Sequence, residues 1–453
     1  MDSQVRDEVL TLAQEKKFNA LLQLLRRYEP ADMADLLQDL PDEQLPIVFR
    51  LLSKETAAYV FVEMDTNRQE FLIGAFSDHE LRDMINEMYL DDTVDVIEEM
   101  PASLVTRILK NTDSDTRAAI NTLLAYPKDS AGSIMTTEFV RLSADMTVEE
   151  AFRRIRRVGT DSETIYTCYV TDNRRLIGVI SVQTMLLSDP EAKIGEIMTT
   201  NVISVSTHDD KESVAALLAR YDFLALPVVD SENRAVGIIT VDDAIDVLSE
   251  EDEEDFSKMA AITPDDRPYL KTSPFRIFKS RIPWLLLLMV SATFTGLIIS
   301  SFESALAVQA VLTAFIPMLM GTGGNAGSQA SVTVIRGLSL DEIHFRDIGK
   351  VVLKELMVSL LTGLSLGAAT FAKLMLIDRP LMGADITLLV AVAVSLTLAL
   401  TVVLAKLIGC TMPLLAKRLG FDPAVMASPF ITTLVDALSL LLYFTVASMM
   451  LGI

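Results

Sequence analysis

One acidic residue stands inside a long apolar segment near the end of the chain and could bind a cation there. The segment ASPFITTLVDALSLLLYF contains Asp436 with no basic residue within a turn or two. A carboxylate at membrane depth costs free energy, and the usual reason for keeping one is an ion or proton pathway. Thr432, Thr433 and Ser428 precede Asp436 by one or two helical turns, and Asp422 lies where the segment begins. We expect this segment to line a pathway with Asp422 at its entrance.

A second candidate is the polar stretch PMLMGTGGNAGSQ, residues 317–329, which follows the apolar run AVQAVLTAFI. Small residues let membrane helices pack closely, but close packing does not explain Asn325 and Gln329 at the same depth. Polar or non-helical backbone is tolerated in a membrane where it lines a water-filled cavity. We therefore expect this stretch to bend a membrane segment beside a hydrated pathway, lined by Asn325 and Gln329.

A third candidate is EEDEED, six consecutive acids at residues 250–255. Such a run is usually a solvated face. Crowded carboxylates also raise the free energy unless cations screen or bridge them, and oxygen ligands without His or Cys suit hard ions such as Mg²⁺ or Ca²⁺. A bridging cation is therefore the alternative interpretation of the run.

The charge of the chain is divided unevenly. The net charge is −23, yet residues 276–453 hold 12 basic and 9 acidic residues, so the acidic excess lies in residues 1–275. This balance argues against nucleic-acid binding, which needs basic surface, and favours cations as partners. The two cysteines form no metal-ligand or disulfide pattern, which fits a reducing cytoplasm for the acidic part.

The second part of the chain has the composition of a membrane domain. Apolar stretches of about the roughly 20 residues that span a bilayer lie at 282–300, 305–320, 351–377, 386–410 and 430–453. Basic residues gather before the first stretch, between the second and third, and between the fourth and fifth. The positive-inside rule therefore predicts a multi-pass protein of the cell (inner) membrane with cytoplasmic N-terminal domains and an outside C-terminus.

Two internal repeats organise the acidic part. Residues 31–41 (ADMADLLQDLP) align with residues 91–101 (DDTVDVIEEMP) in a region of helical apolar spacing, which predicts stacked helix pairs. Further on, IMTTEFVRLSADMTVEEAFRRIRR with YTCYVTDNRRLIGVISV is echoed by IMTTNVISVSTHDDKESVAALLAR with LALPVVDSENRAVGIITV. Each copy predicts a helix and two short strands around a turn.

This second repeat resembles a tandem of cystathionine β-synthase-type (CBS) domains. In that family a Thr or Ser followed three residues later by Asp often holds an adenosine ribose. Thr240 and Asp243 fit that pattern, whereas Ser181 and Thr184 depart from it. The resemblance thus makes Thr240 and Asp243 the candidates for an adenine nucleotide such as a regulatory ATP.

The whole chain resembles the MgtE family of magnesium channels and transporters, on PMLMGTGGNAGSQ, on FDPAVMASPFITTLVDALSLLLYF and on the order of its parts. The resemblance implies a multidomain, non-enzymatic membrane protein. Its parts would be an all-α superhelical domain at 1–130, α/β tandem CBS domains at 131–248, an acidic connecting (plug) helix at 249–275 and a five-helix transmembrane pore domain at 276–453. It also implies a homodimer in the lipid bilayer, with the last helix of each subunit lining a pore on the two-fold axis.

The resemblance further implies that Asp436 is the pore aspartate and that Mg²⁺ bridges between the cytoplasmic domains close the pore. The candidate bridging and entrance acids are Asp422, Asp91, Asp95, Glu212, Asp222, Asp243, Asp246, Glu251, Glu254 and Asp255. Tyr59 stands where some members have an acid, so a bridge there is absent or differently built. Ser428 replaces an amide of some relatives, which leaves its part in ion binding open.

Two other functions are compatible with parts of the sequence. The same oxygen ligands would serve a transporter of another divalent ion, such as Mn²⁺ or Co²⁺, or an exporter. A membrane-anchored nucleotide sensor would use the CBS pair alone, but an anchor needs neither Asp436 nor the glycine-rich stretch. No phosphate-binding Gly-Lys-Ser loop is present, which argues against an ATP-driven pump.

Overall fold

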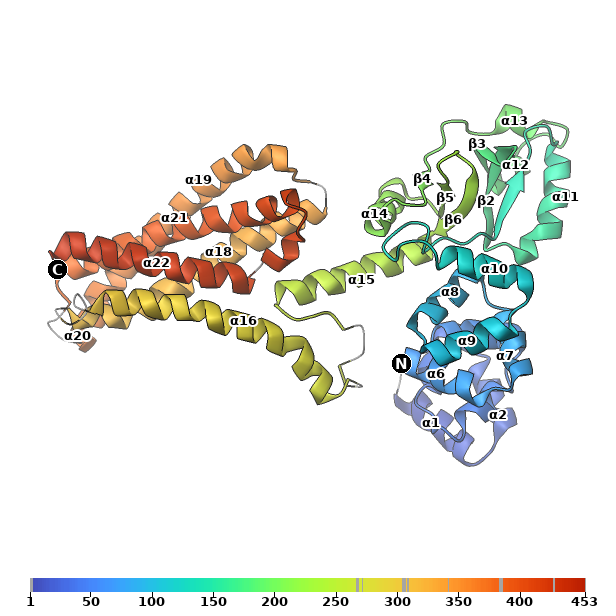
Figure 1. The fold of residues 1–453 in the computed structure, drawn as a ribbon, viewed down its shortest axis with the longest axis horizontal. Coiled ribbons are helices and arrows are strands. Elements are labelled where there is room, and N and C mark those ends of the chain that lie inside the picture. Colours follow the sequence, from blue (N-terminus) through green and yellow to red (C-terminus); the bar gives the residue numbers. More distant parts are fainter. Residues whose placement is uncertain are drawn as a thin grey trace. The chain divides into compact units, whose positions relative to one another are not determined.

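The fold is that of a computed structural model, which describes residues 3–265, 269–270, 272–303, 307, 309–340, 342–382, 386–426 and 428–452. The chain divides into two compact units, Met1–Ser249 and Glu250–Ile453. The first unit contains a helical part and two small α/β domains, and the second contains long apolar helices (Figure 1). This is the predicted fold class.

The described residues before position 124 form helices only, as predicted. These are α1 (Ser3–Gln14), α2 (Phe18–Leu25), α3 (Pro30–Leu37), α4 (Leu45–Phe49), α5 (Lys54–Val62), α6 (Thr66–Ala75), α7 (Asp78–Ile85), α8 (Leu90–Glu99), α9 (Ala102–Asn111) and α10 (Ser114–Leu123). The two aligned repeat segments each begin one residue inside a helix, α3 and α8 respectively. Buried Leu, Ile, Val and Met side chains join these helices into one core.

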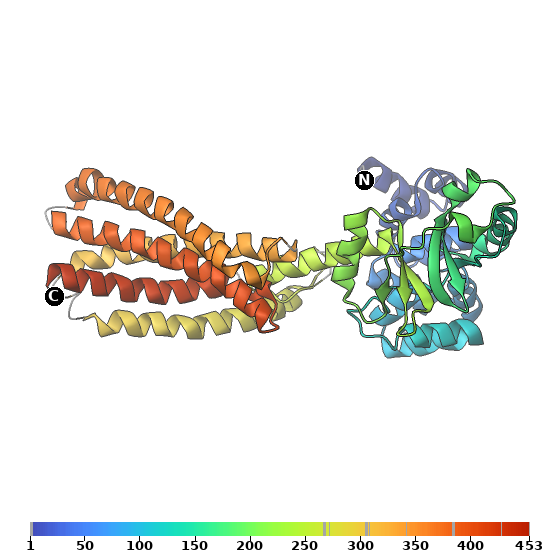
Figure 2. The same ribbon diagram turned by 90° about the horizontal axis from the view of Figure 1, so that it is seen from above.

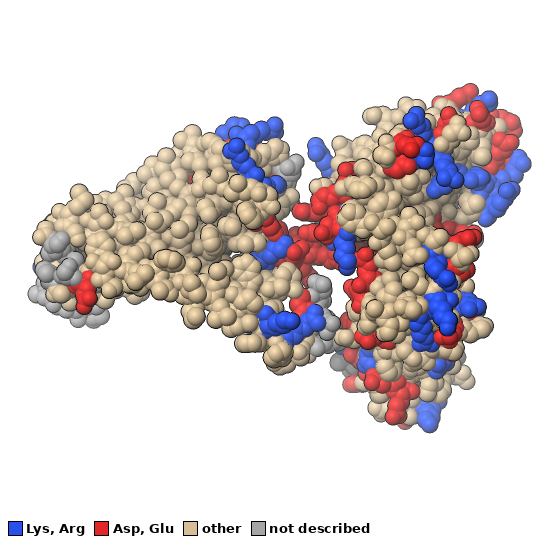
Figure 3. Space-filling model, in the orientation of Figure 1, with Lys and Arg blue, Asp and Glu red and all other residues tan. Residues whose placement is uncertain are grey.

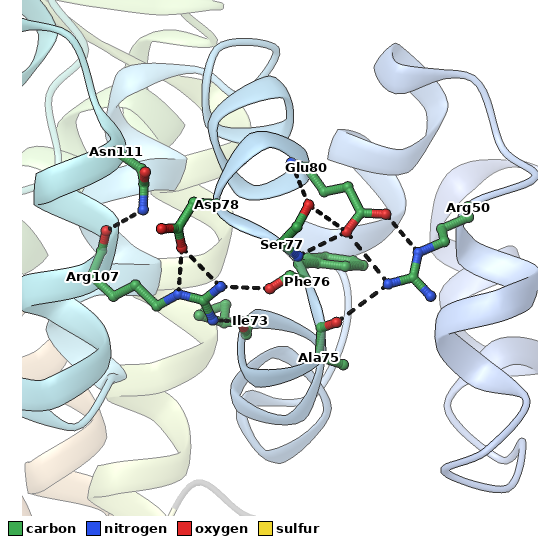
Figure 4. A network of polar contacts seen from close by, with 9 residues as sticks. All are labelled: Arg50, Ile73, Ala75, Phe76, Ser77, Asp78, Glu80, Arg107 and Asn111. Atoms are coloured by element: carbon green, nitrogen blue, oxygen red, sulfur yellow. Dashed lines mark hydrogen bonds and ion pairs between the residues drawn. The ribbon is translucent and has the colours of Figure 1, made fainter.

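Two arginines connect helices of this part that are not neighbours in the sequence, by binding carbonyl groups at helix ends, which lack partners within their own helix. Arg107 donates to the carbonyls of Ile73 and Phe76 and pairs with Asp78 at 3.1 Å. Arg50 pairs with Glu80 at 2.6 Å and donates to the carbonyl of Ala75 (Figure 4). These two arginines clamp the end of α6 and the start of α7 from two sides, which fixes the stacking of the helices.

The two α/β domains have matching three-stranded sheets. The first contains β1 (Phe139–Leu142), α11 (Val148–Val158), η1 (Gly159–Asp161), β2 (Thr164–Asp172), β3 (Arg175–Ser181), α12 (Val182–Leu186) and α13 (Ile194–Ile197). The second contains β4 (Val205–Ser206), α14 (Lys211–Tyr221), β5 (Ala225–Val229), β6 (Ala235–Thr240) and α15 (Val241–Met259). In each sheet the first strand runs parallel to the second, and the second antiparallel to the third.

The first strand of each sheet was not predicted. Both β1 and β4 are short and join their sheet only by pairing with a strand more than 20 residues later, β1 with β2 and β4 with β5. The predicted hairpins β2–β3 and β5–β6 are confirmed. A local sequence pattern reveals a hairpin, but it does not reveal a short edge strand whose partner is remote.

The connecting helix differs from its predicted extent. A single helix, α15, begins at Val241 inside the second α/β domain, runs through the acidic residues and ends at Met259, so it neither starts at residue 249 nor reaches residue 275. Thr240 provides the reason for the early start: its backbone N–H and hydroxyl both contact Asp243, which caps the first turn.

Among the described residues of the second unit, five long helices follow α15 and run alongside one another (Figure 2). They are α16 (Pro274–Ser301), α18 (Ile316–Ser339), α19 (Ile348–Lys373), α21 (Leu388–Arg418) and α22 (Ser428–Leu451). Shorter elements are η2 (Ala310–Phe315), η3 (Phe345–Asp347), the π-helical turn η4 (Leu374–Asp378), α20 (Arg379–Met382) and η5 (Pro423–Met426). Within the described residues, four segments are long and apolar enough to cross a membrane, and α18 is not one of them.

The second long helix has other bounds than predicted. It spans Ile316–Ser339 and not 305–320, and residues 317–329 all lie in continuous α-helix. The physical reason is packing against α21 and α22. A β-carbon at Gly324 would lie 2.8 Å from Thr432 Cγ2, and one at Gly327 would lie 2.9 Å from Ile431 Cγ2. The glycines thus let α18 lie closer to its neighbours than any other residue would allow.

Candidate functional site

Asp436 lies near the middle of α22, and its side chain is half-buried. Its Oδ1 atom is buried and has no hydrogen-bond partner among the described residues. An unsatisfied carboxylate oxygen inside a protein is costly, and a bound cation would satisfy it. Asp436 therefore has a carboxylate oxygen that is available to bind a cation, as expected of a residue that lines an ion pathway.

A second pair of charges lies inside the helical unit and was missed from the sequence. Lys406 of α21 and Glu355 of α19 are 8% and 14% exposed, and their Nζ and Oε2 atoms are 3.7 Å apart. The two charges neutralise each other across the α19–α21 interface. Lys406 is a lone charge in an apolar segment and was visible in the sequence, whereas Glu355 follows Lys354 directly, so only the structure shows the pairing.

The other predicted pathway residues lie on two helices. Asn325 and Gln329 are one turn apart on α18, and both are exposed in the single chain. Thr432 Cγ2 faces Gly324, so Thr432 contributes to the packing of α22 on α18. The side chain of Ser428 lies outside the described part of the structure. Asp422, which precedes α22, has one oxygen 2.6 Å from Lys258 Nζ on α15.

In the first unit an acidic cluster joins the helical part to both α/β domains. We use this name for Asp91 and Asp92 at the start of α8, Glu138 before β1, Glu163 before β2, and Asp243 on α15. Asp91 is only 6% exposed. Asp91 and Asp243 were predicted as bridging acids, and the structure brings them close enough to interact electrostatically. Asp92, Glu138 and Glu163 were missed, since their proximity depends on contacts between distant segments.

Burial and mutual repulsion both favour the protonated forms of this cluster. Burial, followed by the charges of Asp243 and Glu163, raises the pKa of Asp91 well above its usual value. The same two causes raise the pKa of Asp92 to about 7 and that of Glu163 to about 8. For Asp243, burial outweighs the hydrogen bond from Thr240 and raises the pKa to about 6. The cluster therefore lacks counter-charge, which a cation could supply.

The remaining predicted acids do not join this cluster as one site. Asp246 lies near Glu63, whose pKa is raised by burial and then by the charges of Asp246 and Asp35. Glu212 is on the first turn of α14, and Asp222 follows that helix in a left-handed conformation with φ 52°. Asp95 is exposed on α8, and Glu251, Glu254 and Asp255 follow one another along α15. Over the described residues, no three Asp, Glu, His or Cys side chains are arranged to hold one metal ion.

Tyr59, which stands where some family members have an acid, packs against Tyr89 with ring centroids 6.4 Å apart. Burial, followed by the hydrogen bond with Tyr59 and the charge of Glu163, raises the pKa of Tyr89. An aromatic pair thus flanks the acidic cluster at this point.

The candidate nucleotide residues already have a structural role. The Thr240 hydroxyl contacts Asp243, and in the first α/β domain the Ser181 hydroxyl accepts a hydrogen bond from the Thr184 backbone at 3.0 Å. Both positions therefore cap the helix that follows the third strand. A nucleotide ribose would have to compete with the contact between Thr240 and Asp243.

Charged side chains mark one end of the long helices. Lys and Arg gather there, whereas most of the length of these helices is free of charge (Figure 3). Eight basic residues lie near the beginning of α16, the end of α18, the beginning of α19 and the end of α21: Arg276, Lys279, Arg281, Arg336, Arg346, Lys350, Lys417 and Arg418. An apolar surface with basic residues at one end is typical of a membrane domain with that end inside the cell.

Family comparisons cover nearly all of these parts. Residues 28–129 match the MgtE intracellular N domain, residues 131–189 and 194–250 each match the CBS domain, and residues 316–446 match the MgtE divalent cation transporter domain. The chain is 38% identical over 443 residues to the magnesium transporter MgtE of Thermus thermophilus and 33% identical over 445 residues to that of Bacillus subtilis. In both cases the alignment covers 97% of this chain and 96% of the relative.

Two solved structures resemble the first unit. The cytosolic domain of the Mg²⁺ channel MgtE in complex with ATP is 40% identical with a TM-score of 0.50, covering 52% of this chain and 98% of that one. The soluble part of a magnesium transporter is 31% identical with a TM-score of 0.51, covering 55% and 98%. Sequence likeness over the whole length and structural likeness over the soluble part agree, and the chain is a membrane protein of the MgtE family of magnesium transporters, with an intracellular N-terminal domain and a CBS pair.

Proposed function

We propose that the protein conducts Mg²⁺ into the cell through a pathway lined by α22, with Asp436 as the ion-binding residue. The observation that carries this proposal is the buried carboxylate oxygen of Asp436 without a partner among the described residues, in an apolar helix of a magnesium transporter family. Mg²⁺ loses its water shell reluctantly, so a carboxylate that holds the hydrated ion avoids most of the dehydration cost.

The pathway lies on the two-fold axis of a homodimer. A single chain places one Asp436 on α22 and exposes Asn325 and Gln329 on α18. A two-fold axis doubles each of these groups, which gives two carboxylates for one divalent ion. The membrane part has five spans: α18 is a span despite its low apolarity, because its glycines are packed against α21 and α22. This topology places the C-terminus outside.

Magnesium bound to acids of the first unit closes the pathway. The acidic cluster supports this regulation, since burial and repulsion make it short of positive charge. No three acids are arranged to hold one ion in the described residues, so in this proposal the side chains of the acidic cluster rearrange when the ion binds. The moving parts of this proposal are the helical domain at 1–130, the CBS pair at 131–248 and the membrane part at 276–453, which α15 (Val241–Met259) connects. ATP bound at Thr240 and Asp243 adjusts the closure.

The experiment is Mg²⁺ uptake into liposomes that contain this protein alone. Uptake that rises with the external Mg²⁺ concentration and is suppressed by millimolar Mg²⁺ on the side of the cytoplasmic domains is expected. Uptake equal to that of protein-free liposomes would contradict conduction. Because the matched family model describes divalent cation transport generally, Mn²⁺ and Co²⁺ are supplied as competitors, and stronger uptake of either would favour that ion as substrate.

A further inference from the structure

The end of α15 carries a lysine that is held between two carboxylates. Lys258 Nζ lies 2.6 Å from Glu254 Oε1, one turn earlier on the same helix, and 2.6 Å from Asp422 Oδ2, in the segment before α22. Three residues before Lys258, Asp255 Oδ2 accepts a hydrogen bond from the Ser339 hydroxyl at the end of α18, at 3.3 Å. The last turns of α15 are therefore attached to α18 and to the start of α22.

Lys258 supplies at this point the positive charge that a bridging metal would supply. The Lys258 ammonium group lies 2.6 Å from one oxygen of each carboxylate, so the charges of Asp422 and Glu254 are both countered here without a metal ion. Mg²⁺ requires near-octahedral oxygen coordination at about 2.0–2.1 Å. An ammonium group in contact with both carboxylates occupies the place of such an ion.

We propose that Lys258 is a built-in cation that holds the end of α15 to the entrance of α22 in the absence of bound metal. Asp422 and Glu254 then bind a divalent ion only when Lys258 is displaced. This inference rests on the proposed function, because Asp422 stands at the entrance of the pathway. The acids of the first unit then make closure depend on Mg²⁺. The contact between Lys258 on α15 and Asp422 before α22 persists at low Mg²⁺.

The test measures attachment directly, without transport. The full chain carrying Asp255→Cys and Ser339→Cys is placed in lipid nanodiscs with EDTA and treated with a short bis-methanethiosulfonate cross-linker. The parent should cross-link readily. Lys258→Gln should lower the cross-linking rate roughly threefold, the size expected for losing a partly exposed ion pair. Lys258→Arg should retain the rate, because a guanidinium group also reaches two carboxylates. Single-cysteine variants control for the buried native Cys168 and Cys410.

The same cross-linking rates are then measured with millimolar Mg²⁺ in place of EDTA. In Lys258→Gln the freed carboxylates should accept the ion and recover the cross-linking rate, whereas the parent should not change. Asp422→Asn should lower the rate as Lys258→Gln does, without recovery in Mg²⁺. An unchanged rate in Lys258→Gln or in Asp422→Asn, or an equal loss in Lys258→Arg, would overturn the proposal. The cross-link does not depend on Mg²⁺ conduction, so its outcome is separate from that of the uptake experiment.

Discussion

The carboxylate of Asp436 lacks a hydrogen-bond partner for one oxygen among the described residues, whereas the carboxylates of the acidic cluster lack positive charge. Asp436 lies alone in an apolar helix with one unpaired oxygen, whereas Asp91, Asp92 and Glu163 compete with each other for positive charge. The sequence was sufficient to find Asp436, because a lone charge in an apolar run is visible without a fold. It was not sufficient to find Glu163, which joins the cluster through the fold of the first CBS domain.

The cluster predicts how the stability of the first unit depends on pH. The folded-state pKa is about 7 for Asp92 and about 8 for Glu163, above the ordinary values of 3.8 and 4.5. The folded state therefore binds more protons than the unfolded state between these values. The contribution of the cluster to stability is complete below pH about 4 and is lost as the pH rises through about 7 to 8.

Thermal unfolding of residues 1–249 in EDTA should thus give a lower midpoint at pH 8 than at pH 6. Millimolar Mg²⁺ should reverse most of the loss at pH 8, because an ion that binds only the folded state stabilises it. The double variant Asp92→Asn, Glu163→Gln should weaken both effects, since Asp91 and Asp243 remain. A midpoint independent of pH and Mg²⁺ in the parent would show that these acids are not short of positive charge.

Helices and strands were predicted correctly from the sequence where a local pattern of residues determines them. Helical spacing revealed the helices of residues 3–123, and the turns TDNRR and DSENR revealed the hairpins β2–β3 and β5–β6. The prediction failed at α18, because glycine lowers local helix propensity while allowing close helix packing, and only the neighbours α21 and α22 show which effect prevails. It also missed β1 and β4, whose partners are remote in sequence.

The close packing of α18 on α21 predicts that alanine is tolerated at one glycine and not at another. A β-carbon at Gly409 would collide with the Gly327 carbonyl, a backbone group that cannot rotate away, whereas one at Gly321 would meet nothing within 4 Å. Gly409→Ala should therefore lower the unfolding free energy by about 1–3 kcal/mol.

Gly321→Ala should be neutral or slightly stabilising, since alanine has the better helix propensity. Thermal unfolding in detergent, followed by size-exclusion chromatography, compares the two variants. Equal midpoints would mean that α18 and α21 are not packed as closely as the structure has them.

In the proposed regulation, Mg²⁺ closes the pathway by binding acids of the helical domain and of the CBS pair, so closure requires the helical domain. Deleting residues 1–130 removes Asp91 and Asp92 from the acidic cluster but leaves the long helices unchanged. The shortened protein should conduct at internal Mg²⁺ concentrations that close the parent, as patch recordings can measure. The same deletion combined with Asp436→Asn should not conduct. If the shortened protein closes as readily as the parent, the helical domain has no role in closure.

Mg²⁺ flux into proteoliposomes tests whether the transported ion binds at Asp436. Asp436→Asn preserves size but removes both charges of the dimer, while Asp347→Asn makes the same change on a residue at the end of a long helix, where it pairs with Lys350. Uptake by Asp436→Asn should fall to the level of protein-free liposomes, with a normal size-exclusion profile, while Asp347→Asn transports as the parent does. If Asp436→Asn also transports as the parent does, the ion does not bind at Asp436.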